Sequence, residues 1–156
     1  MIDINKVLVV YLAGGMKGGW QDEVKKACPG IIFIDPREHA LKDEEGYTAW
    51  DLAGVERADI VLGYMEASNP GGAGLAVEFG WGARAGKLLL LAEQKGYHQE
   101  RYFGMVRALA HDRIDGDGAL KRIIATLNSI RVMGLDRFKE TVCKRSSRQQ
   151  HGHIAI

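Results

Sequence analysis

Hydrophobic residues along the chain gather in short runs, separated by longer stretches in which apolar residues recur at helical spacing. The runs contain few polar positions, which is typical of parallel strands that are covered on both faces of a sheet. The expected strands are residues 6–14, 31–34, 59–65 and 87–93, with a short fifth strand at residues 113–114.

The stretches between the strands predict helices. The helix over residues 48–58 is expected to begin at Thr48, a residue type favoured at the N-cap. The other expected helices cover residues 20–28, 100–110 and 117–132, and a segment that ends near Ala85. Strands that alternate with helices predict an α/β three-layer sandwich with a five-stranded parallel sheet, and right-handed crossovers favour the flavodoxin/Rossmann-like order 2-1-3-4-5.

Length and charge narrow the possible functions. We expect a single domain over residues 1–134, followed by a C-terminal extension, residues 135–156, that ends in a partly disordered polar tail. A net charge of +1 gives no electrostatic case for nucleic acid or a membrane as partner. The apolar runs are too short to cross a bilayer, no secretory leader is visible, and Cys28 and Cys143 are far apart in the sequence. These features predict a cytoplasmic protein.

In a sheet of this order, ligands bind beyond the carboxyl ends of strands one and three. Two glycine-rich loops follow those strands, Asp35 follows strand two, and Asp51 is expected in the first turn of the next helix. The residues expected at this edge are Tyr11, Gly14, Gly15, Lys17, Gly18, Gly19, Asp35, Asp51, Ser68, Asn69, Gly71, Gly72 and Glu78.

Most of these residues also have a purely structural interpretation. Glycines after strands permit tight turns, and the first loop lacks both a dinucleotide-binding spacing and the ending of a P-loop. Asp51 is also explained as an acid near a helix start, and Tyr11 as a core residue. Glu78 is harder to explain, because its neighbours at helical spacing are apolar or glycine and an unpaired buried carboxylate is costly. A site in which the Tyr11 hydroxyl holds Glu78 would account for it.

At these residues the chain resembles the nucleoside 2-deoxyribosyltransferase family, which includes the deoxynucleoside 5′-monophosphate N-glycosidases. The resemblance covers about residues 6–95, and more weakly continues to about residue 130. It rests on the segments "VYLAGGMKGGWQDE", "WDLAGVERADIVLGYME" and "GAGLAVEFGWGARAGK". It implies that Glu78 is the nucleophile, that Asp51 is the acid assisting the leaving base, and that Tyr11 orients Glu78.

This chemistry agrees with the residue types. A carboxylate can trap the oxocarbenium-like centre as a glycosyl ester, and a glutamate of ordinary pKa, about 4.3, is ionised at neutral pH. Water then completes hydrolysis, whereas a second base completes transfer. Gly72 departs from the family, because transferases carry a base-binding aspartate there and monophosphate glycosidases a serine. Ser68 or Asn69 is a possible substitute.

Hydrolysis is favoured, because the first loop resembles the glycosidases and the base-binding aspartate is absent. Three alternatives stay open: a base-exchanging deoxyribosyltransferase, a cytokinin-activating-type phosphoribohydrolase suggested by "PGGAGLAVE", and a non-catalytic nucleotide-binding module. The expected partner is a small nucleoside or nucleotide. We expect no cofactor and no metal, because the histidines lack ligand spacing. The resemblance also implies a homo-oligomer. The aromatic residues and Met105 within residues 96–107 suggest a subunit contact or a lid, and an amphipathic helix packed on the sheet explains this segment equally well.

Overall fold

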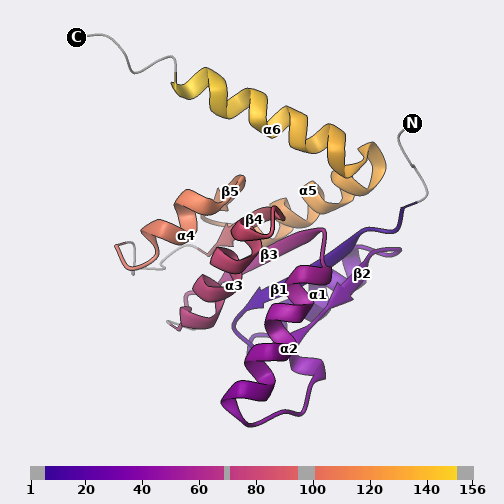
Figure 1. Cartoon of the computed structure of the whole chain (residues 1–156). Helices are drawn as coiled ribbons and strands as arrows, with labels where there is room; N and C mark the ends of the chain where they lie inside the picture. The colour runs from indigo at the N-terminus through magenta and orange to yellow at the C-terminus, as the bar shows by residue number, and fades with distance from the viewer. Residues whose placement is uncertain (1–5, 69–70, 95–100, 151–156) are drawn as a thin grey trace.

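The structure is a computed structural model that describes residues 6–68, 71–94 and 101–150, with the backbone alone for residues 143–150. Its sheet has five parallel strands in the order β2-β1-β3-β4-β5, which confirms the predicted fold (Figure 1). The strands are β1 (Val9–Gly14), β2 (Ile32–Ile34), β3 (Ile60–Met65), β4 (Leu88–Glu93) and β5 (Asp112–Asp115).

Helices cover both faces of the sheet and form three layers with it. The elements are α1 (Trp20–Ala27), the 3-10 helix η1 (Pro36–Glu38), α2 (Glu44–Arg57), α3 (Ala73–Arg84), α4 (Gly104–Leu109), α5 (Ala119–Met133) and α6 (Leu135–Gln150). On one face, alternate strand residues pack against Trp20 of α1 and Leu127 of α5. On the other, they pack against Val55 of α2, Phe79 of α3 and Val106 of α4. This explains why the strands are apolar at successive positions.

Helix α2 begins earlier than its sequence pattern indicates. The Asp43 side chain accepts a hydrogen bond from the Gly46 N–H at 2.6 Å and caps the helix. The expected N-cap at Thr48 is therefore wrong, because an N-cap further upstream satisfies the first free N–H groups. Asp51 consequently lies about two turns inside the helix rather than in its first turn.

The C-terminal segment contains a helix that the polar sequence did not suggest. Leu135 and Phe138, in the first turns of α6, pack against the core face that α5 covers, and Val142 is buried. Helix α6 reaches Gln150, which includes most of the segment expected to be loose, and residues 151–156 lie outside the described residues. The domain boundary at residue 134 stays a prediction. Within the described residues, no helix is both long and apolar enough to span a membrane.

Candidate active site

Glu78 and Tyr11 meet at the junction of α3 and β1. Tyr11 is fully buried and Glu78 is 8% exposed, and the tyrosine hydroxyl donates a hydrogen bond of 2.7 Å to Glu78 Oε1. The contact expected between these two side chains is therefore present. It fixes one oxygen of the carboxylate and leaves the other for a different partner.

Close packing holds both residues in place. Gly54 of α2 lies against the Tyr11 ring, and Gly63 of β3 lies against the ring of Phe79, the residue after Glu78. A Cβ atom at Gly63 would lie 2.6 Å from Phe79 Cε2, which is well inside contact distance. The absence of side chains at these two positions lets α2 and α3 approach the sheet closely.

The packing of Tyr11 gives a stability prediction. In a Gly54→Ala variant the new Cβ would lie 2.9 Å from Tyr11 Cε2 and 3.1 Å from Ile34 Cγ2. Overpacking of this kind should lower the free energy of unfolding by about 1–3 kcal/mol. The matched control is Gly80→Ala, since nothing lies within 4 Å of a Cβ there; we expect it to raise the free energy by about 0.5–1 kcal/mol. Urea unfolding of both variants measures the difference, and equal effects would contradict the tight packing.

The charge state of Glu78 differs from the sequence expectation. Burial raises its pKa to about 7, the nearby Asp51 carboxylate adds to the rise, and the hydrogen bond from Tyr11 opposes it. A glutamate with an ordinary pKa was the wrong expectation, because the apolar surroundings that make Glu78 conspicuous also disfavour its charge. Burial together with the two carboxylates raises the pKa of Tyr11, which stays a neutral donor.

Asp51 faces this pair from α2, and His39 lies beside it. Burial raises the pKa of Asp51, opposed by contacts with Tyr11 and His39. His39 Nε2 is 3.5 Å from Asp51 Oδ1, and the His39 ring packs edge-on against Trp50 with centroids 4.9 Å apart. Within the described residues, neither ring nitrogen of His39 nor Asp51 Oδ1 has a hydrogen-bond partner. These atoms are therefore buried polar groups beside the cavity whose hydrogen-bonding capacity is not used.

A cavity of about 600 Å³ opens in front of these groups. Its wall includes Glu78, Asp51 and His39, together with glycines from both glycine-rich loops. The residues that line it are Gly14, Gly15, Met16, Pro36, His39, Leu41, Lys42, Tyr47, Asp51, Gly71, Gly72, Gly74, Leu75 and Glu78. The cavity therefore lies at the carboxyl ends of β1 and β3, where the strand order predicts a ligand site.

Among the described residues, the other expected substrate-binding residues do not line the cavity. Lys17, Gly18, Gly19 and Ser68 belong to the same two loops, and Asn69 lies outside the described residues. Asp35 is fully buried away from the cavity.

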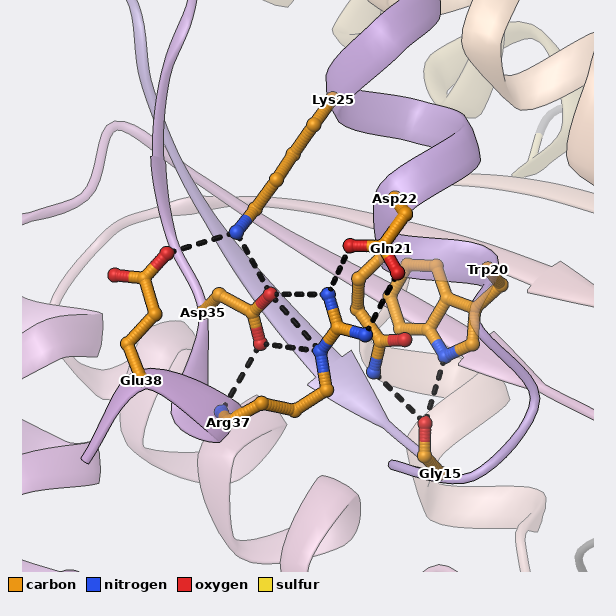
Figure 2. A network of polar contacts seen from close by, with 8 residues as sticks. All are labelled: Gly15, Trp20, Gln21, Asp22, Lys25, Asp35, Arg37 and Glu38. Carbon is orange, nitrogen blue, oxygen red and sulfur yellow. Dashed lines mark hydrogen bonds and ion pairs between the residues drawn. The ribbon is translucent and has the colours of Figure 1, made fainter. Parts of the chain in front are cut away.

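Asp35 is the centre of an ion-pair network (Figure 2). Its carboxylate accepts hydrogen bonds from the Arg37 guanidinium and lies 2.8 Å from Lys25 Nζ. Burial alone would raise the pKa of Asp35, but the Arg37 and Lys25 contacts outweigh it and lower that pKa. Arg37 also pairs with Asp22, so the network joins η1 to α1 and holds the chain just before His39. Asp35 was expected to contact the substrate. In the structure its oxygens are paired with Arg37 and Lys25, and it does not line the cavity.

The first glycine-rich loop is fixed by two neighbouring side chains. Trp20 Nε1 and Gln21 Nε2 each donate a hydrogen bond of 2.8 Å to the Gly15 carbonyl oxygen, and Figure 2 shows both converging on it. The cavity wall on the β1 side is therefore anchored to the start of α1.

His39 is the main feature that sequence reasoning missed. The histidines were interpreted only as poor metal ligands, and among the described residues no group of three or more His, Cys, Asp or Glu side chains is placed to hold a metal ion. The position of His39 in the sequence could have indicated its place in the site, because the segment after β2 reaches the same edge of the sheet as the two glycine-rich loops. Tyr47, Leu41 and Lys42 reach the cavity from the same segment.

The hydrogen bond from Tyr11 predicts a pH effect. If ionised Glu78 is required, activity should rise as the pH increases through about 7, because the pKa of Glu78 is about 7. Tyr11→Phe removes a bond that lowers this pKa, so the rise should move to higher pH and the rate at pH 7 should fall about 10-fold. A pH–rate profile of both proteins measures the shift. An unchanged profile with a lower rate at every pH would show that Tyr11 does not act through the Glu78 pKa.

No protein-family model and no curated protein sequence matches the chain. Among solved structures, it is similar to a CMP N-glycosidase from Clostridium botulinum, with 16% identity, a TM-score of 0.53, and coverage of 77% of this chain and 98% of that one. It is also similar to a 2-deoxyribosyltransferase from Leishmania mexicana, with 18% identity and a TM-score of 0.49 over 55% of this chain. The chain spans 64% of the length of that transferase. The similarity to the CMP N-glycosidase thus confirms the fold that the family resemblance implies for this chain.

Proposed function

We propose that the protein hydrolyses the N-glycosidic bond of a (deoxy)nucleoside or of its 5′-monophosphate, with Glu78 as the nucleophile. The observation that carries this proposal is the 2.7 Å hydrogen bond between Tyr11 and Glu78 at the wall of a cavity that Asp51 also lines. Two carboxyl groups at one cavity are the groups that glycoside chemistry needs.

In the first step, Glu78 attacks the anomeric carbon of the sugar and forms a glycosyl ester. The bond between that carbon and the base breaks, and its electron pair goes to the base nitrogen. In the reactive form Glu78 is ionised and Asp51 carries the proton, which it supplies to the departing base. Tyr11 keeps its own proton and holds the Glu78 oxygen in place.

In the second step, water attacks the same carbon and the ester bond to Glu78 breaks. Asp51, now a carboxylate, accepts a proton from the water, so the free sugar leaves with a hydroxyl group and both carboxyl groups return to their starting states. Burial of Glu78 favours the first step rather than this one, because apolar surroundings disfavour the charged carboxylate that the first step consumes and this step re-forms.

The comparison with the CMP N-glycosidase supports the proposal at the level of the fold. That protein acts on a nucleotide according to its name, and the present chain has a similar fold with a carboxylate pair at the carboxyl edge of its sheet. Local chemistry and fold therefore point to the same bond.

The test is incubation with a panel of ribo- and deoxyribonucleosides and their 5′-monophosphates, with and without a second free base. Chromatography should show free base released without any second base present. Product that forms only with a second base would identify a transferase instead. Folded protein that yields no product from any substrate, but binds one, would identify a binding module and contradict the proposal.

A further inference from the structure

His39 is fixed from two directions at the wall of the cavity. It directly follows η1, where Arg37 forms ion pairs with the fully buried Asp35 and with Asp22 (Figure 2). The His39 ring packs edge-on against Trp50 of α2, with ring centroids 4.9 Å apart. The protein therefore holds both the backbone before His39 and the imidazole ring itself.

The ring places a buried nitrogen opposite a buried oxygen of Asp51. His39 Nε2 lies 3.5 Å from Asp51 Oδ1, just beyond the usual length of a hydrogen bond. Among the residues with described side chains, neither atom has a hydrogen-bond partner. Buried polar atoms are rarely left in this state, because they have also lost their hydrogen bonds to water. Closing the short gap would pair an N–H donor with a carboxyl acceptor.

Direct contact of these nitrogens with a substrate explains their position less well. Both ring nitrogens of His39 are buried, although its side chain is 11% exposed and lines the cavity. The exposed part of His39 therefore belongs to carbon atoms. Asp51 lines the same cavity, and only its Oδ1 atom is buried without a partner. The polar atoms of His39 can thus affect a substrate through Asp51.

A hydrogen bond to Oδ1 would serve Asp51 in the proposed reaction. It would fix the carboxyl group and leave Oδ2 to carry the proton for the departing base. As that proton leaves, negative charge develops on Asp51, and an N–H donor beside the carboxyl group stabilises this charge. In the second step the same bond would keep Oδ2 directed at the attacking water.

We propose that His39 is a positioning residue, which donates the hydrogen on Nε2 to Asp51 Oδ1 during base release and so directs Asp51 at the departing base. The inference rests on the proposed function and adds a residue to its acid half. The nitrogen atoms of His39 contact neither the sugar nor the base.

Two substitutions separate this hydrogen bond from the packing of the ring. His39→Phe keeps an aromatic ring against Trp50 and removes both nitrogens, whereas His39→Gln loses the ring and keeps an N–H group. With a nucleoside that the wild type cleaves, His39→Phe should lower kcat for base release roughly 30-fold and change KM by less than about three-fold. His39→Gln should lower kcat by only about three-fold. A role in packing alone predicts the opposite order, and that order would overturn the inference.

A double-mutant cycle tests whether His39 acts through Asp51. Asp51→Asn alone should lower kcat by about 10²-fold or more, and the addition of His39→Phe should lower it by no more than about two-fold further. Losses that multiply in the double variant would show that His39 acts independently of Asp51. Urea unfolding of each variant checks that it is folded.

Nitrogen NMR of Glu78→Gln with bound nucleoside gives a readout that needs no turnover. The imidazole signals that His39→Phe removes should show the hydrogen on Nε2, and they should shift when Asp51 is replaced by asparagine. A hydrogen on Nδ1 alone, or signals that Asp51→Asn leaves unchanged, would contradict the role of His39 while the proposed function stands. Absence of base release by the wild type from every substrate would instead contradict the proposed function.

Discussion

Replacing Glu78 by glutamine is expected to lower kcat for base release by about 10³-fold or more, because the amide cannot form the glycosyl ester. The amide oxygen can still accept the Tyr11 hydrogen bond, so the cavity should keep its shape. Substrate binding should therefore survive the substitution. The measurement is single-turnover base release together with calorimetric binding of the same nucleoside.

The matched control is Glu140→Gln, which removes an exposed carboxylate on α6. It should leave base release within a factor of about two of the wild type, as surface substitutions away from a site usually do. Activity of Glu78→Gln equal to that of the control would show that the nucleophile lies elsewhere.

The same variant should be more stable than the wild type above neutral pH. The pKa of Glu78 is about 7 in the folded protein, against an ordinary value of 4.5. Between these values the folded state keeps a proton that the unfolded state releases, so the free energy of unfolding falls as the pH rises from 4.5 to 7. Glutamine has no such titration. At pH 8 its advantage over the wild type should exceed its advantage at pH 4 by about 2–3 kcal/mol.

Urea unfolding of both proteins at the two pH values measures this difference. Comparison between pH values cancels any fixed cost of burying the amide, which makes the change with pH the informative quantity. A constant difference between the proteins at both pH values would show that Glu78 ionises with an ordinary pKa. The expected gain in stability with loss of activity is the usual trade-off at a catalytic group.

The centre of the sheet was predictable because β1, β3 and β4 are almost wholly apolar, whereas β5 is mostly polar. β3 and β4 are buried throughout, and that composition allows only a sheet with helices on both faces. The ends of helices were less predictable. The cap at Asp43 precedes the first apolar residues of α2. The sequence of α6 is mostly polar, and only a few residues, among them Leu135 and Phe138, pack against the core.

The pairing of Tyr11 with Glu78 was also predictable, because an acid on an apolar helix face needs a nearby donor. The ion pairs of Asp35 were not predictable. Lys25 belongs to α1 and Arg37 to η1, and only the folded chain brings them together around Asp35. The position of His39 beside Asp51 has the same origin. The raised pKa of Glu78 depends on the depth of burial, a quantity that residue spacing does not contain.

The central claim is that Glu78 forms a covalent bond to the sugar. A nucleoside with fluorine at the 2′ position should slow hydrolysis of the ester, because fluorine withdraws electron density from the anomeric carbon. Mass spectrometry of the acid-quenched, digested protein should then find the mass of the fluorinated sugar on the peptide that contains Glu78, and find none in Glu78→Gln. The sugar on another residue, or base release by the wild type with no sugar on any peptide, would contradict this account.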